Sequence, residues 1–185
     1  MAAALPLLGA ATAACAGMAG MYFALQAGLP SSSNLPAMGD IALLKPTLFP
    51  AFVSIALFYV FLFVQSASAF STHQVLKDEA KARGDKAPVL GDVKYGGKAI
   101  PVLRMERTVG NFLEQSVPFY LGLFLHAVFV SPNAAAKAGW LWIAFRCYYP
   151  YVWMMKFPAV LTSTMPAYGC VAYLWWGVMT AATKL

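Results

Sequence analysis

Hydrophobic positions along the chain gather into five long runs separated by shorter polar stretches. The runs cover residues 5–29, 48–70, 107–130, 137–157 and 159–182. A helix needs about 20 apolar residues to cross the hydrocarbon core of a bilayer, so each run predicts a transmembrane helix. The connections around residues 131–133 and 157–158 are short, which predicts that the last three helices are antiparallel neighbours in one bundle.

Two polar stretches divide the chain into its expected parts. Residues 31–46 are a Pro/Ser linker that follows an N-terminal hydrophobic helix, residues 1–30, and precedes a membrane domain, residues 47–185. Within that domain, residues 71–103 form the polar loop. The first part of this loop predicts an extension of the preceding helix to about Arg83, and the Gly- and Pro-rich residues 84–101 predict turns.

Composition places the chain in the membrane class. Of its 185 residues 61% are hydrophobic and 11% are charged, whereas a soluble domain is about a quarter charged. Eight of the 13 Lys and Arg lie between Lys77 and Arg107. The positive-inside rule therefore predicts that loop 71–103 faces the cytosol, or the matrix or stroma if the membrane is mitochondrial or plastid rather than endoplasmic reticulum. The net charge of +6 then reflects topology, and no nucleic-acid partner is expected.

The spacing of cysteine and histidine residues does not predict a metal site or a nucleophilic cysteine. The three cysteines lie in apolar runs and show no metal-ligand spacing. We therefore expect them to be reduced and to pack as small apolar residues; they are Cys15, Cys147 and Cys170. His73 and His126 have no histidine or carboxylate three or four residues away on the C-terminal side. No metal site is expected.

The third run begins with an unusual polar sequence, "RMERTVGNFLEQSVPF", at residues 104–119. Arg104, Arg107, Asn111, Glu114 and Pro118 are spaced by 3, 4, 3 and 4 residues, which places them on one face of a helix. A carboxylate at the depth of Glu114 is costly in lipid, so we expect it to face the bundle interior or a wet cavity.

Arg146, in the fourth run, is the candidate partner for that carboxylate. Three interpretations of the two charges remain open from the residues alone. They form a structural Arg146–Glu114 pair that sets the register of the bundle, or they bind a small polar ligand between helices, or they line an ion or proton path. Tyr149 lies three residues after Arg146 and can extend the polar face.

The polar pattern resembles the MAPEG family, the membrane-associated proteins of eicosanoid and glutathione metabolism. That family shows an arginine, an asparagine four residues on, a glutamate three further and a proline four further, followed by an apolar residue. Arg107, Asn111, Glu114, Pro118 and Phe119 match this pattern, with Arg104 one turn earlier and Arg146 and Tyr149 in the next helix. The resemblance covers residues 47–183.

The resemblance implies an all-α integral membrane fold, a four-helix transmembrane bundle to which the N-terminal hydrophobic helix is an addition. It also implies a homotrimer that binds glutathione, as co-substrate, between subunits. An enzyme similar to microsomal glutathione S-transferases would conjugate glutathione to lipophilic electrophiles or reduce hydroperoxides with it. The glutathione-binding residues that the resemblance implies are Arg104, Arg107, Asn111, Glu114, Arg146 and Tyr149.

The chain also departs from the family pattern. Several family enzymes have an arginine near the start of the last helix that activates the thiol, and this chain has none there. Thr162 or Ser163 can donate a hydrogen bond instead, and Lys156 is a nearby cation. Trp153 and Gly110 replace a tyrosine and a basic residue found in other members. The catalytic residues are therefore unassigned, and the alternative function is a non-catalytic scaffold or accessory subunit of a larger membrane complex.

Overall fold

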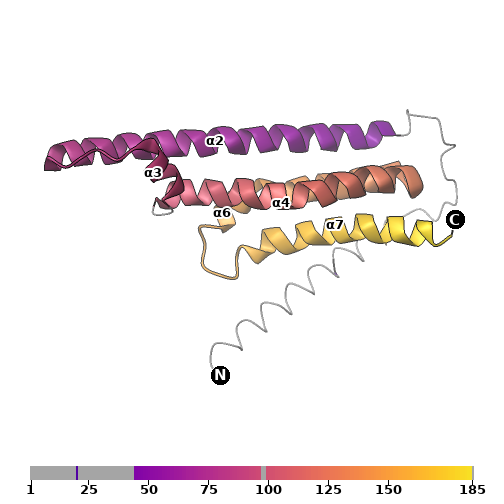
Figure 1. Ribbon diagram of the computed structural model, residues 1–185. Helices are drawn as coiled ribbons and strands as arrows, with labels where there is room; N and C mark the ends of the chain where they lie inside the picture. The colour runs from indigo at the N-terminus through magenta and orange to yellow at the C-terminus, as the bar shows by residue number, and fades with distance from the viewer. Residues whose placement is uncertain (1–19, 21–43, 97–98, 185) are drawn as a thin grey trace, which may run out of the picture. The chain divides into compact units, whose positions relative to one another are not determined.

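The described part of the chain consists of helices and connecting turns. The computed structural model describes residue 20 and residues 44–96 and 99–184. Its helices are α2 (Lys45–Arg83), α3 (Leu90–Tyr95), α4 (Ile100–Phe129), α5 (Pro132–Cys147), α6 (Tyr149–Val152) and α7 (Leu161–Ala182) (Figure 1). The described residues contain no β-strand, which confirms the all-α class for this part of the chain. Apart from residue 20, the predicted N-terminal helix and the linker as far as residue 43 lie outside the described residues.

The described residues fall into two compact units. The first unit contains residues 44–54 and 115–184, and the second contains residues 55–114. α2 and α4 each contribute one part to each unit. Each unit has its own packing.

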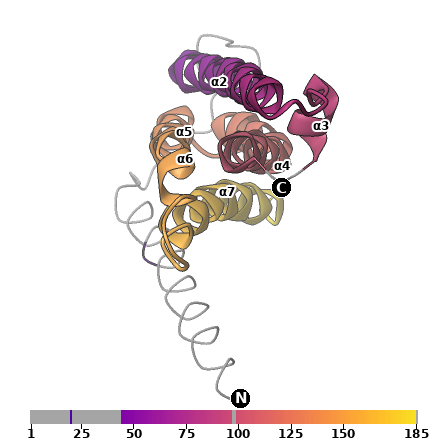
Figure 2. The same ribbon diagram turned by 90° about the vertical axis from the view of Figure 1, so that its left-hand side faces the viewer.

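In the first unit, glycines allow helices to approach closely. A Cβ atom at Gly139 of α5 would lie 3.1 Å from Cβ of Pro50 in α2 and 3.2 Å from a methyl carbon of Leu123 in α4. A Cβ atom at Gly122 of α4 would lie 3.1 Å from the indole nitrogen of Trp175 in α7. Small residues at helix contacts are typical of membrane bundles. Figure 2 shows α5, α6 and α7 of this unit side by side.

Hydrogen bonds between side chains and neighbouring helices fix the register of α4 in the same unit. Each bond joins α4 to a different helix, so α4 contacts α2, α5 and α7. The bonds are Ser54 Oγ with Tyr120 Oη (2.9 Å), Trp142 Nε1 to Gln115 Oε1 (3.2 Å) and Trp175 Nε1 to the carbonyl oxygen of Pro118 (2.9 Å).

The limits of α5 follow from local sequence. Ser131 caps its start, since its hydroxyl oxygen accepts a hydrogen bond from the backbone N–H of Ala134, and Pro132 occupies the first turn. The helix ends at Cys147, and the short α6 follows. Pro150 has no N–H to donate to the carbonyl of Arg146. One continuous helix over the predicted run 137–157 is therefore wrong, because Pro150 breaks it.

In the second unit, α3 covers a small apolar core. Val93 of α3 is buried with Ala69 of α2 and Val102 of α4, and Leu76, Leu90 and Ala99 surround them. The predicted extension of α2 to Arg83 is confirmed. The expectation of turns alone over residues 84–101 is wrong, because the contact that Val93 makes with this core stabilises a helical turn that its Gly-rich sequence does not indicate.

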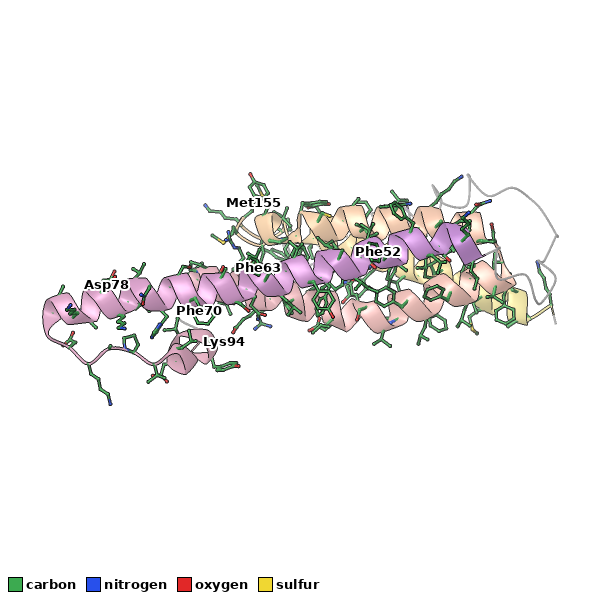
Figure 3. All side chains as sticks on the ribbon, turned by 90° about the horizontal axis from the view of Figure 1, so that it is seen from above. Phe52, Phe63, Phe70, Asp78, Lys94 and Met155 are labelled. Atoms are coloured by element: carbon green, nitrogen blue, oxygen red, sulfur yellow. The ribbon has the colours of Figure 1, made fainter. Side chains whose placement is uncertain are left out.

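Two helices of the described residues are long and apolar enough to cross a membrane. They are α2, with 39 residues, and α4, with 30 residues. The surface of α2 in the second unit carries large apolar side chains, among them Phe63, which is 76% exposed, and Phe70 (Figure 3). Beyond them along α2, Asp78 lies in the polar extension. An exposed aromatic surface of this kind suits contact with lipid. The two other predicted spans in this part of the chain correspond to α5 with α6 and to α7.

Candidate functional site

Four of the six predicted site residues lie on one continuous helix, α4. Arg104, Arg107, Asn111 and Glu114 form a stripe along one side of its first half, in the second unit. We call these four residues the α4 stripe. The opposite side of the same half-helix is the packed side, with Val102, Met105, Val109 and Phe112 buried. Phe58 and Phe61 of α2 contact Phe112 at ring-centroid distances of 5.6 and 6.0 Å. The stripe therefore points away from the apolar core of its unit.

The four side chains differ in exposure. Arg107 and Glu114 are exposed, whereas Arg104 and Asn111 are half-buried. On the single chain Glu114 therefore does not face the bundle interior, the first of its two expected places, and a wet cavity stays a prediction. The cause is geometric: Glu114 continues the series from Arg104 and Arg107, and the packed side of α4 lies across the helix from this series.

Arg104 has a feature that suits an anionic ligand. Its Nε atom is buried and has no hydrogen-bond partner among the described residues. The backbone carbonyl of Arg104 accepts a hydrogen bond of 2.8 Å from the hydroxyl of Thr108, which lies toward the packed side of the helix. A buried guanidinium N–H without an acceptor is unfavourable, so a bound carboxylate would stabilise this side chain.

Arg146 lies in the last turn of α5, in the first unit, and it is buried. Its Nη2 atom donates to the carbonyl oxygen of Ser163 at 2.9 Å and to the Ser163 hydroxyl at 3.3 Å. The guanidinium carbon lies 5.2 Å from the ring centroid of Tyr149, a cation–π contact. Tyr149 is itself buried, and its ring packs on the guanidinium.

Two hydroxyl groups proposed as thiol activators already donate their protons within the chain. Ser163 is buried, and its hydroxyl donates to the carbonyl oxygen of Phe145. Thr162 is exposed, and its hydroxyl donates to the carbonyl oxygen of Ala159 at 2.7 Å. The nearby hydroxyl of Tyr148 donates to the carbonyl oxygen of Thr162 at 2.7 Å. Both hydroxyl groups thus form hydrogen bonds with the backbone at the connection between α5 and α7.

Comparison with protein families decides the class of the molecule. The model of the MAPEG family matches residues 47–182, which is most of the chain. The chain belongs to the MAPEG family. No curated protein and no solved structure matches it significantly. The MAPEG match begins in the first turns of α2 and ends at the last residue of α7, so it includes the α4 stripe, Arg146 and Tyr149.

The predicted site residues of this MAPEG protein form two groups. The α4 stripe belongs to the second unit, and Arg146 with Tyr149 belongs to the first. Within each group the structure brings the predicted residues together. An ion pair between Arg146 and Glu114 stays a prediction.

Residues that can ligate metals are scattered in the described part of this MAPEG chain. No group of three or more His, Cys, Asp or Glu side chains gathers there. His73 Nε2 lies 3.0 Å from the carbonyl oxygen of Pro88, and His126 is buried against Tyr173. Cys147 and Cys170 are free thiols, and Cys15 lies outside the described residues.

Sequence reasoning missed the partner of Arg146. It treated Ser163 as a group that acts on the thiol, whereas the structure places it against the guanidinium. One sequence feature was available: a buried arginine needs acceptors, and Ser163 is a small hydroxyl residue just beyond the turn that follows α5. Arg146 and Ser163 are 17 residues apart and lie in different helices, so helical periodicity does not predict their contact.

Proposed function

We propose that this MAPEG protein binds glutathione at the α4 stripe and transfers it to, or reduces with it, lipophilic electrophiles or hydroperoxides. The observation that carries the proposal is the α4 stripe itself. Two arginines, an amide and a carboxylate lie along one side of a membrane helix, on the side away from its apolar core. Charged side chains in such a helix are costly unless they have polar partners, and MAPEG proteins generally use glutathione.

The chemistry of glutathione complements these side chains. Glutathione carries two carboxylates, an ammonium group and two amide groups. Arg104 and Arg107 suit the carboxylates, since guanidinium and carboxylate form paired, charge-assisted hydrogen bonds. Asn111 suits an amide group, and Glu114 suits the ammonium. Arg107 and Glu114 are seven residues apart, about 10 Å along a helix, which is close to the roughly 10 Å span of an extended tripeptide.

A second copy of the chain would complete such a site. Arg107 and Glu114 are exposed on the single chain, and facing lipid would be unfavourable for both. A homotrimer, as the family suggests, would cover this side of α4 with a neighbouring subunit and enclose the ligand between subunits. The oligomer is part of the proposal.

The reaction has two forms. In conjugation, the glutathione thiolate attacks an electrophilic carbon, a carbon–sulfur bond forms and the leaving group departs with the electron pair of its bond. In reduction, two glutathione molecules become the disulfide while a hydroperoxide becomes an alcohol and water. Both acceptors are apolar enough to concentrate in the bilayer that surrounds α2 and α4.

Replacement of Arg107 by alanine tests this function. We expect Arg107→Ala to lower kcat/KM for glutathione consumption with a lipophilic aryl halide by about tenfold or more, because a charge-assisted hydrogen bond is lost. The measurement is the rate of thioether formation by the detergent-purified protein. The matched control is Arg83→Ala, since Arg83 is an exposed arginine at the end of α2 that pairs with Asp85 at 3.1 Å.

The control should retain the wild-type rate. Equal losses in both variants would assign the effect to the general charge of the protein. A well-folded wild type without activity toward aryl halides and hydroperoxides would remove the catalytic part of the proposal and favour a scaffold.

A further inference from the structure

Ser163 contacts Arg146 at two points. The residue lies in the first turn of α7 and is fully buried. Its backbone carbonyl oxygen and its hydroxyl oxygen both accept from Nη2 of Arg146, at 2.9 and 3.3 Å. Its hydroxyl proton goes to the carbonyl oxygen of Phe145, the residue that precedes Arg146 in α5. One side chain thus joins the end of α5 to the start of α7.

This arrangement restricts the guanidinium strongly. Nη2 is fixed by two acceptors of one residue, and the ring of Tyr149 lies 5.2 Å from the guanidinium carbon. A guanidinium is planar, so two fixed points on the group limit its rotation. The arginine therefore loses little conformational entropy when it binds an anion, and such preorganisation increases affinity.

From these contacts we infer that Ser163 is a positioning residue that orients Arg146 for an anionic ligand. The inference rests on the proposed function, together with the glutathione-binding role of Arg146 that the MAPEG resemblance implies. Ser163 acts through the arginine and does not act on the thiol, because its single hydroxyl proton is donated to the Phe145 carbonyl. The contact between Ser163 and Arg146 lies where the chain turns from α5 to α7.

The test compares glutathione affinities, measured by calorimetry on full-length protein in detergent. Ser163→Ala removes the hydroxyl oxygen but keeps the backbone acceptor, and we expect Kd for glutathione to rise about tenfold. Ser163→Thr restores a hydroxyl at the same position, and we expect its Kd to return to within about threefold of the wild-type value. The thermal midpoint of each variant is measured in parallel.

The matched control is Thr180→Ala. Thr180 is a hydroxyl residue of the same helix that donates only to the carbonyl oxygen of Trp176, one turn earlier. We expect its Kd to equal that of wild type. If Ser163→Ala cannot be purified folded, Ser163→Cys replaces it, because a thiol has similar size but forms weaker hydrogen bonds.

Arg146→Lys and Arg107→Ala separate this inference from the proposed function. Loss of affinity in Arg146→Lys and Ser163→Ala, with recovery in Ser163→Thr, supports the positioning role. Loss in Arg146→Lys with wild-type affinity in Ser163→Ala overturns the positioning role and leaves the proposed function intact. Wild-type affinity in Arg146→Lys, with loss in Arg107→Ala, shows that Arg146 takes no part in binding glutathione and overturns the inference. A wild type that binds no glutathione overturns both.

Discussion

Trp142→Ala is expected to lower the free energy of unfolding by about 3–5 kcal/mol, the range for removal of a buried large aromatic side chain. Trp142 is fully buried in α5. Its ring stacks on Phe119 of α4 with centroids 4.0 Å apart and an interplanar angle of 9°. Its indole N–H also donates to Gln115. The substitution removes the stacking contact and the hydrogen bond and leaves a cavity, and chemical unfolding in detergent measures the result.

The control for Trp142 is Trp176→Ala. Trp176 lies in α7 and is 59% exposed, so its removal leaves no cavity of this kind. We expect a change within about 1 kcal/mol, since an exposed substitution has a small effect. Equal destabilisation by the two substitutions would contradict the packing described for the first unit.

Gly177→Leu is the second large effect that we expect, a loss of about 1–3 kcal/mol through overpacking. A Cβ atom at Gly177 of α7 would lie 2.6 Å from both Cδ2 and Nε2 of His126 in α4. The imidazole is buried and has Tyr173 beside it, at a ring-centroid distance of 5.3 Å. The ring is confined by Tyr173, so the imidazole or the two helices must shift to admit the new side chain. The thermal midpoint of the detergent-purified variant measures the loss.

Gly110→Leu is the matched substitution for Gly177. A Cβ atom at Gly110 of α4 would meet no atom within 4 Å. Leucine also favours the helix over glycine by roughly 1 kcal/mol, so we expect the midpoint of this variant to stay equal or rise. A Gly177→Leu protein as stable as wild type would show that α4 and α7 are not in close contact at this point.

The helices could be predicted from the sequence where local chemistry determines them. The 3, 4, 3 spacing of the α4 stripe defines a helical face. The start of α5 at Pro132 lies five residues before the predicted run, because that run was bounded by its apolar residues, although a serine followed by proline indicates a helix start. The extension of α2 to Arg83 follows from its charged, Ala-containing sequence. The break after Cys147 was missed, although Pro150 indicates it, because the apolar run continues through it.

The remaining features depend on contacts between segments far apart in sequence. α3 forms because Val93 packs with Ala69 and Val102, and no pattern within residues 84–101 shows these partners. The exposure of Glu114 depends on which side of α4 is packed. The spacing of residues shows which of them share a helix face, but it does not show which elements pack against that face. The contact between Arg146 and Ser163 depends on the turn that returns the chain from α5 to α7.

Glutathione binding by the α4 stripe is tested by calorimetric titration of glutathione into detergent-purified wild type, Arg107→Ala and Arg83→Ala. We expect wild type and Arg83→Ala to bind saturably, with Kd between micromolar and millimolar, which is a binding free energy of about −8 to −4 kcal/mol. We expect Arg107→Ala to lose this binding. A well-folded wild type that releases no heat of binding, or an Arg107→Ala protein that binds as tightly as wild type, would contradict glutathione binding by the α4 stripe.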